Sequence, residues 1–394
     1  MAFRLELREQ TPVWFNIVFP LSAVLGTLLL CSGLVALAGA NVFHAYSELF
    51  LSAVSSRFNL VETFVKAAPL IFTGLAVAVA FRAKFWNIGA EGQLLAGAMA
   101  AAYIGGIEAL PSFSLVPLMI TASALAGAGW ALLPAILRTR FKVDDVVTTL
   151  LLNFVMFYVM TALLDGPWKD PLSGYPDSPD IRMDAEFPIL LSATRLHLGV
   201  LLSLLAAPMV WWLIRRTTLG FSISVVGENP SASAYGGIPI TRILIYTALI
   251  SGALAGLAGA GEVGGLHFQV MSGISPGYGY TGIVIAMLAR LNPIGVVPAA
   301  LFFAVVVTGA EAMSRATGVP VFLADVIQGT ALVTMLMKMA QEVLNSYWEK
   351  AFQPESLRYA RIGVGEVIIV AFGVLIWILI LIPRFVFEQA EASF

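Results

Sequence analysis

Long apolar runs separated by short polar segments dominate this chain of 394 residues. A helix needs about 20 apolar residues to cross the hydrocarbon core of a membrane. The pattern therefore predicts an all-α, polytopic membrane protein, with about ten transmembrane helices in a core and a possible eleventh near the C-terminus. The predicted spans cover residues 15–38, 67–82, 90–107, 113–137, 146–164, 196–214, 241–260, 277–290, 294–312, 321–338 and 364–383.

Charged residues between the runs predict how the chain is oriented. Basic residues precede the first span and follow the second, fourth, sixth and eighth: Arg4, Arg8, Arg82, Lys84, Arg138, Arg140, Lys142, Arg215, Arg216 and Arg290. All of them lie on one side if the N-terminus is cytoplasmic, as the positive-inside rule requires. The loop 165–195, on the other side, has six acidic residues and three basic ones. We therefore expect a multi-pass protein of the cell inner membrane, in contact with membrane lipid, with a cytoplasmic N-terminus.

The longest polar, turn-rich interruption that begins and ends with arginine is Arg215–Arg242, RRTTLGFSISVVGENPSASAYGGIPITR. Asn229-Pro230 favours a turn, and Pro230 is well suited to the first position of a helix. We interpret the segment as a cytosolic loop that carries one short helix parallel to the membrane.

A second polar segment lies at 86–93, where Asn87, Glu91 and Gln93 stand among apolar residues. One interpretation is a broken helix pair near a polar pathway, because irregular backbone within a membrane must be buried in protein or line a wet cavity. The other is a tight cytosolic turn with Glu91 at a helix start, where the helix dipole favours negative charge. Asn153, inside the span 146–164, either joins helices or faces the pathway.

Glycine and proline also interrupt the chain before the span 277–290. Two short interrupted segments, here and at 86–93, are typical of transporters built from two related halves. No residue-level repeat supports this symmetry, so it is a hypothesis.

The composition confirms the membrane class and excludes several chemistries. The chain is 59% hydrophobic and 12% charged, with mean hydropathy +0.89, whereas soluble domains are nearer a quarter charged. One cysteine and three well-separated histidines give no metal-ligand spacing. No Gly-Lys pair exists for a phosphate loop, and no nucleophile–base motif is present. We expect no enzyme activity, no catalytic residue, no cofactor or metal, and no nucleic-acid partner.

Three segments, in order, resemble the motifs of permease subunits of ATP-binding-cassette (ABC) uptake transporters for nucleosides and simple sugars. They are FWNIGAEGQLLAGAMAA, VDDVVTTLLLNF and RRTTLGFSISVVGENPSASAYGGI, spread over about 70–310. The family belongs to the branched-chain amino acid and ribose-type permeases. The resemblance implies a permease subunit paired with a second related permease, an ABC ATPase subunit that supplies ATP hydrolysis, and an extracytoplasmic substrate-binding lipoprotein that delivers a nucleoside, a sugar or a related small polar solute.

In this family a short helix of the cytosolic loop fits a cleft on the ATPase and couples its closure to the permease. The resemblance places that helix over Gly227–Gly237. The implied ATPase-coupling residues are Gly227, Glu228, Asn229, Pro230, Ser231, Ala234, Gly236 and Gly237. An amphipathic loop lying on lipid headgroups is the alternative. The resemblance also implies a solute path near the polar segment, with the candidate residues Asn87, Glu91, Gln93 and Asn153.

The chain departs from the family in extending well beyond the usual end. We expect a permease domain over 1–345, with its coupling loop at 215–242, and a C-terminal extension over 346–394 with an extra apolar helix. The competing hypothesis is an ion-coupled secondary transporter that acts without an ATPase and uses Glu91 as its coupling acid. It predicts transport by this chain alone.

Overall fold

A computed structural model describes residues 28–29, 31–33, 35–36, 39–318 and 326, all within one compact unit, Leu28–Gln328. The predicted span 364–383, all of 321–338 except Val326, most of 15–38, and the domain boundary at residue 345 lie outside the described residues. These expectations stay predictions.

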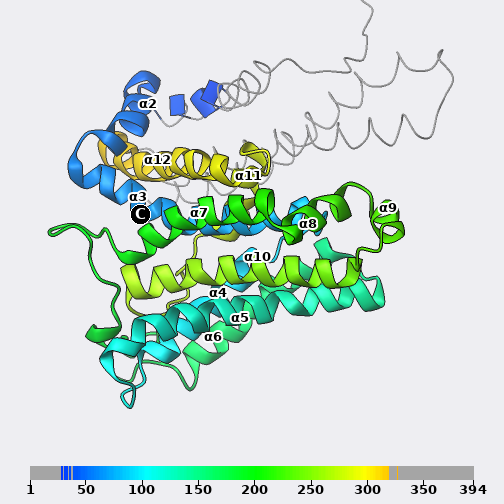
Figure 1. Cartoon of the computed structure of the whole chain (residues 1–394). Coiled ribbons are helices and arrows are strands. Elements are labelled where there is room, and N and C mark those ends of the chain that lie inside the picture. Colours follow the sequence, from blue (N-terminus) through cyan, green and yellow to red (C-terminus); the bar gives the residue numbers. More distant parts are fainter. Residues whose placement is uncertain (1–27, 30, 34, 37–38, 319–325, 327–394) are drawn as a thin grey trace, which may run out of the picture. The chain divides into compact units, whose positions relative to one another are not determined.

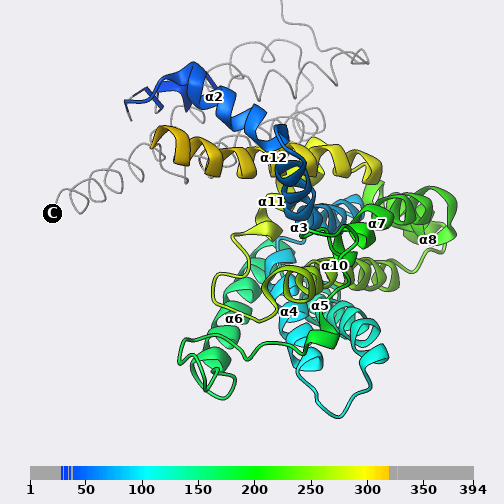
Figure 2. The same cartoon turned by 90° about the vertical axis from the view of Figure 1, so that its left-hand side faces the viewer.

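The described part of the chain is helical, and isolated bridges are the only β pairing within it. Figures 1 and 2 show the helices from two sides. In chain order they are α2 (Val42–Leu51), η1 (Ser52–Val54), α3 (Arg57–Arg82), α4 (Ala90–Gly105), α5 (Ser112–Phe141), α6 (Asp145–Asp165), η2 (Met183–Ala185), α7 (Leu198–Arg216), α8 (Thr218–Glu228), α9 (Pro230–Tyr235), α10 (Ile240–Glu262), η3 (Val263–His267), α11 (Tyr278–Leu288) and α12 (Pro293–Thr317).

Six of the described helices are long and apolar enough to cross a membrane: α3, α5, α6, α7, α10 extended by η3, and α12. The count of about ten spans for the whole chain is therefore not established. α4 and α11, with 16 and 11 residues, are about 24 and 16 Å long at 1.5 Å per residue, short of a hydrocarbon core of about 30 Å. The predicted span 67–82 begins earlier, at Arg57, because Ser56 caps the helix there.

The sequence analysis missed α2, which follows the first predicted span. Asn41 begins this helix as its N-cap residue, since its side chain accepts hydrogen bonds from the N–H groups of Phe43 and His44. It also missed η3, a π-helical continuation of α10.

α3 and α10 form the centre of the bundle. Nine-tenths of the most apolar window of α3 is buried, because α7, α10, α11 and α12 all pack against it. α10 packs against α3, α4 and α5.

Small residues let α10 approach α5 closely. A Cβ atom added to Gly252 would lie 2.3 Å from the carbonyl oxygen of Gly127, and one added to Gly256 would lie 2.1 Å from that of Ser123. Such close packing is typical of helix contacts in membranes, where small residues allow the backbones to meet. The Gly252-x-x-x-Gly256 spacing on α10 therefore marks a helix contact.

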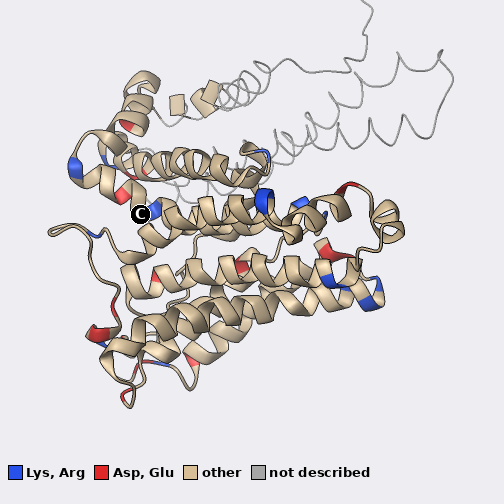
Figure 3. Cartoon of the chain, in the orientation of Figure 1, with Lys and Arg blue, Asp and Glu red and all other residues tan. Residues whose placement is uncertain are grey.

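The two ends of the bundle differ in charge. Basic residues gather at the end that also holds α8 and α9, while the 165–195 segment lies at the other end (Figure 3). Consecutive spans α5, α6, α7 and α10 run alternately between these ends (Figure 1). The grouping of charges is thus the one that the sequence predicts for the two sides of a membrane.

Candidate functional site

Two helices, not one, form the loop after α7. α8 ends at Glu228, and α9 begins at Pro230 after a single residue. Asn229 between them is extended (φ −148°, ψ 97°), because a residue before proline is disfavoured in the helical region. The prediction of one helix over Gly227–Gly237 is therefore wrong in its bounds, while the prediction that Pro230 takes the first helical position is confirmed.

α9 has six residues and is capped at both ends. A helix this short is unstable alone, because too few hydrogen bonds offset the cost of starting it. The Asn229 side chain accepts a 3.0 Å hydrogen bond from the Ala232 N–H. At the other end Gly237 is left-handed (φ 77°), and the Ile238 N–H donates to the Ser233 carbonyl, the closure that glycine after a helix permits. The caps fix the shape of α9 within the chain itself.

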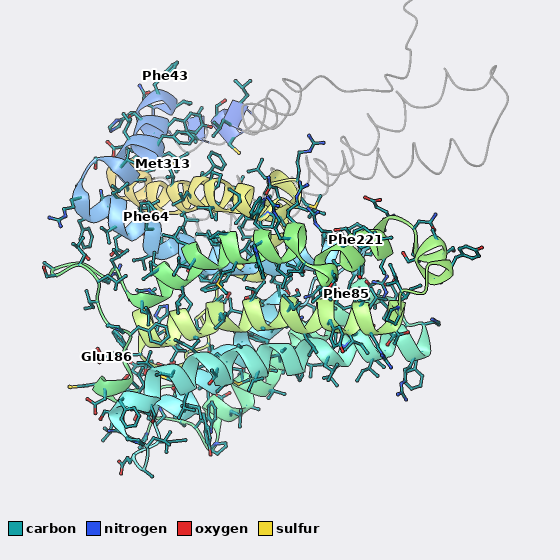
Figure 4. The ribbon with its side chains drawn as sticks, viewed as in Figure 1. Phe43, Phe64, Phe85, Glu186, Phe221 and Met313 are labelled. Carbon is teal, nitrogen blue, oxygen red and sulfur yellow. The ribbon has the colours of Figure 1, made fainter. Side chains whose placement is uncertain are left out.

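Most of the predicted ATPase-coupling residues are exposed on and beside α9: Glu228, Asn229, Pro230, Ser231, Ala234, Gly236 and Gly237. Gly227 is buried instead. Tyr235, the last residue of α9, is 98% exposed and was not predicted. Phe221 on α8 is also exposed, at 63% (Figure 4). An aromatic residue that ends a run of small polar residues is the signal that could have identified Tyr235.

The segment between α3 and α4 is an irregular stretch, Ala83–Gly89, held by side chains buried in the bundle. Asn87 is fully buried and bonds through both ends of its amide. Its Nδ2 donates to Gln93 Oε1 at 3.0 Å and to Ser251 Oγ, on α10, at 2.9 Å. Its Oδ1 accepts from the Gly89 N–H at 2.9 Å and from Gln93 Nε2 at 3.0 Å. Asn87 and Gln93 thus form a closed pair that ties the start of α4 to α10.

Asn153, on α6, holds the same segment from the opposite side. Its Oδ1 accepts from the Gly92 N–H at 2.9 Å, and its Nδ2 donates to the Ile88 carbonyl at 2.9 Å and to Tyr280 Oη at 3.2 Å. Only 2% of Asn153 is exposed. Its amide therefore replaces backbone partners that α4 lacks in its first turn.

Glu91 joins the first turn of α4 to the first turn of α11. Its carboxylate accepts a 2.6 Å hydrogen bond from the Gly279 N–H. This N–H group lies in the first turn of α11 and has no partner within that helix. A negative charge is also favoured at helix N-termini, and the N-termini of α4 and α11 meet at this one carboxylate.

This arrangement bears on the two interpretations of the 86–93 segment. Asn153 lies eight residues after Asp145, the start of α6, which is about 12 Å along that helix. The start of α4 is level with Asn153, so the break lies inside the bundle rather than at its end. α4 then runs toward the end that holds 165–195, while α11 runs toward the basic end (Figure 1). The position of the break favours the broken-helix interpretation, and a polar pathway beside it stays a prediction.

All four predicted path residues, Asn87, Glu91, Gln93 and Asn153, thus converge on this break, and each is at most 8% exposed. Their polar atoms bond to one another and to the backbone. We call these four residues the brace, because their hydrogen bonds hold the first turns of two short helices in place. These helices, α4 and α11, are the half-helices. Contact of these residues with a solute stays a prediction.

Comparison with known proteins places the chain in a family. A family model described as "Branched-chain amino acid transport system / permease component" matches residues 59–337. The chain belongs to this permease family. The glucose ABC transporter permease protein TsgB13 of Haloferax volcanii is 35% identical over 85% of this chain and 91% of its own length. The guanosine ABC transporter permease protein NupP of Bacillus subtilis is 34% identical, over 79% of this chain and 90% of its own length. A second guanosine permease protein of that organism, NupQ, is 25% identical over 61% of this chain and 78% of its own length. No solved structure matches.

The chain is therefore the permease subunit of an ABC importer and not an enzyme, since a separate ATPase subunit hydrolyses ATP. Such permeases work with an ATPase and a substrate-binding protein. This assignment favours the importer over the ion-coupled secondary transporter that we kept as the alternative.

The permease also has a buried acid that the sequence analysis did not single out. Glu262 ends α10, and its Oε2 is buried without a hydrogen-bond partner among the described residues. His267 Nε2, at the end of η3, lies 3.4 Å away, within ion-pair distance but not in hydrogen-bond geometry. A lone glutamate in the small-residue run of 258–265 was the available signal, because charge inside a membrane span is costly and commonly functional.

The 165–197 segment closes over the far ends of α4 and α10. The Ser178 N–H donates to the Val270 carbonyl, and the Phe187 N–H donates to the Gly264 carbonyl of η3. The His197 ring is buried against η3, and its Nδ1 accepts the Gly199 N–H at 3.1 Å as the N-cap of α7. Burial lowers the pKa of His197 to about 4, so the imidazole is neutral at pH 7.

Proposed function

We propose that the permease imports nucleosides across the inner membrane, with its N-terminus and its α8–α9 end in the cytoplasm. The basic residues at the α9 end support this orientation, because basic loops stay on the cytoplasmic side. The C-terminal extension over 346–394 remains part of the proposal as an additional apolar helix.

The observation that carries the proposal is α9 itself. It is a short helix that is capped at both ends, exposed on nearly every residue and located at the basic end of the bundle. A preformed projection binds a cleft without paying an ordering cost on contact. We propose that Ser231, Ala234 and Tyr235 enter the ATPase, and that Glu228 and Asn229 lie at the rim of that contact.

Two further partners complete the proposed importer. A second, related permease pairs with this one, as the presence of both NupP and NupQ in one organism suggests for their own system. An extracytoplasmic binding lipoprotein delivers the solute at the end that holds 165–195. We place the solute path along α4 and α11, whose starting turns the brace of Asn87, Glu91, Gln93 and Asn153 positions.

A nucleoside is the proposed solute, since NupP is named for guanosine and matches this chain almost as well as the glucose permease does. Uptake into proteoliposomes that contain the full importer, with labelled guanosine and labelled glucose in parallel, separates the two. We expect ATP-dependent guanosine uptake. Uptake of glucose alone would replace the nucleoside with a sugar and leave the importer assignment intact.

Binding of the ATPase to α9 is tested by co-purification with two variants at one position. Gly236→Pro removes the N–H that bonds to the Ala232 carbonyl and disfavours the helical conformation of Tyr235 before it. Gly236→Ala is the matched control, because its Cβ would have no atom nearer than 3.5 Å. We expect the wild type and Gly236→Ala to retain the ATPase and Gly236→Pro to lose it while eluting as a monodisperse permease. Equal retention by all three would show that α9 is not the contact.

A further inference from the structure

α8 rests directly on the backbone of α3. A Cβ atom added to Gly227, in the last turn of α8, would lie 1.9 Å from the Arg82 carbonyl oxygen and 3.1 Å from the Ala83 Cα. Gly227 is buried, so no solvent or flexible side chain separates the two backbones. Packed backbones are nearly incompressible, and a displacement of one must move the other.

Arg82 extends this contact to a third element. Its Nη2 donates a 2.9 Å hydrogen bond to the Leu291 carbonyl, in the turn between α11 and α12. That turn holds Arg290 and Leu291 both in the left-handed region, at φ 52° and 57°, a conformation that such residues rarely adopt. The Arg82 Nε is buried without a hydrogen-bond partner among the described residues. Within the described ranges, the bond to Leu291 is the one hydrogen bond of this guanidinium.

Charge on the loop also bears on Arg82. Arg215, at the end of α7, and Glu228, at the end of α8, both interact with it electrostatically, the first by repulsion and the second by attraction. Glu228 immediately precedes Asn229, the cap of α9. A shift of α9 therefore changes the position of a charge that acts on Arg82 as well as the backbone contact at Gly227.

The residues that follow Arg82 lead to the break described above. Ala83–Gly89 runs from the end of α3 to the start of α4, and Glu91 there holds the start of α11. The end of α11, through Leu291, returns to Arg82. The Gly227–Arg82 contact is therefore part of a continuous series of contacts, which links the end of α3, the start of α4 and both ends of α11.

We propose that the Gly227–Arg82 contact is the joint through which movement of α9 reaches α3, α4 and α11, with Arg82 as a positioning residue for transport. The inference rests on the proposed binding of the ATPase to α9. The Arg82 guanidinium holds the α11–α12 turn against the end of α3, and the Gly227 backbone pushes on that end. Without either contact, closure of the ATPase no longer rearranges the half-helices.

The test uses the complete importer in proteoliposomes, and it measures ATPase retention, ATP hydrolysis stimulated by the loaded binding protein, and uptake. Arg82→Met removes the hydrogen bond to Leu291 while keeping a long side chain. Arg82→Lys restores a donor. Gly227→Ala forces α8 away from α3, and Gly129→Ala on α5 is its control because a Cβ atom there meets no atom within 4 Å.

For Arg82→Met and Gly227→Ala we expect normal ATPase retention and basal hydrolysis, with uptake per ATP reduced roughly 10-fold, within the range of measured coupling effects. Arg82→Lys should recover part of that ratio, and Gly129→Ala should match the wild type. Unchanged uptake per ATP in Arg82→Met and Gly227→Ala would show that the Gly227–Arg82 contact does not transmit movement of α9. Equal losses of ATP hydrolysis and uptake would show the same. If Gly227→Ala does not fold, the comparison of Arg82→Met with Arg82→Lys decides. If the wild-type permease retains no ATPase, the proposed function is wrong, and the proposal for the Gly227–Arg82 contact fails with it.

Discussion

The carboxylate of Glu91 in α4 accepts a 2.6 Å hydrogen bond from the backbone N–H of Gly279 in α11, a residue 188 positions later in the chain. The N–H groups of Gly277 and Tyr278 bond locally, to the Ser275 hydroxyl. The buried Glu91 side chain adds, from a distant helix, an acceptor for the first turn of α11. This makes α4 and α11 a single unit at their starting turns.

Glu91→Ala should therefore destabilise the permease. The change leaves the buried Gly279 N–H without an acceptor, and a buried donor without a partner costs about 1–3 kcal/mol. We expect the unfolding free energy to fall by about the same amount. Thermal unfolding in detergent measures it, with Glu108→Ala in the exposed α4–α5 turn as the control. Equal melting temperatures would show that Glu91 does not brace α11.

Asn153→Leu should loosen the start of α4 specifically. Leucine fills a similar volume but leaves the Gly92 N–H and the Ile88 carbonyl without partners inside the bundle. We expect a loss of about 2–3 kcal/mol and faster hydrogen exchange of the amides at 88–93 than elsewhere in α4. Thr161→Val on the same helix is the control, because Thr161 bonds only within α6. Exchange that rises equally across the bundle would contradict a local role for Asn153.

Local signals in the sequence account for most of the fold and for part of the site. Apolar runs located eight of the described helices to within a few residues, except that α3 begins ten residues before its predicted start. Asn229-Pro230 marked the start of α9 because proline constrains both itself and its neighbour. The polar residues of the break stood out because polar groups are rare in a span.

Partners across the bundle could not be predicted in the same way. That Glu91 caps α11, that Asn87 bonds to Ser251, and that Gly227 touches Arg82 depend on which faces of distant helices meet. Hydropathy gives the length of a span but not its rotation, which packing against neighbouring helices determines. The packing around the π-helical end of α10 is missed for the same reason, because Phe187 and His197, which lie against its Gly264 and Gly265, come from another segment of the chain.

Acid should loosen the 165–197 segment through His197. The folded state holds this pKa near 4, while an unfolded histidine titrates near 6.5. The unfolded state therefore binds more protons between these values, so the stability is fully present above pH 6.5 and falls as the pH drops toward 4. The difference amounts to about 3 kcal/mol, and less if solvent reaches the ring.

Melting temperatures between pH 7 and 4 measure this effect in the wild type and in His197→Asn. Asparagine can still cap α7 but does not titrate, so this variant should start less stable and lose less on acidification. His44→Asn, at an exposed position, is the control and should keep the wild-type slope. An identical pH dependence in the wild type and His197→Asn would place the acid-sensitive group elsewhere.

Two glycines on α5, Gly127 and Gly129, should respond oppositely to the same substitution. A Cβ at Gly127 would lie 2.2 Å from the Gly252 carbonyl oxygen, in the closest part of the contact with α10, whereas a Cβ at Gly129 meets no atom within 4 Å. Gly127→Ala forces the two helices apart, and overpacking of this kind costs about 1–3 kcal/mol. Gly129→Ala should be neutral or stabilise the helix by up to about 1 kcal/mol, because alanine favours helices more than glycine does. Thermal unfolding measures the two melting temperatures. Helix propensity cancels from their difference, because both variants replace glycine by alanine within one helix. Equal melting temperatures would mean that α5 and α10 are not in the close contact described here.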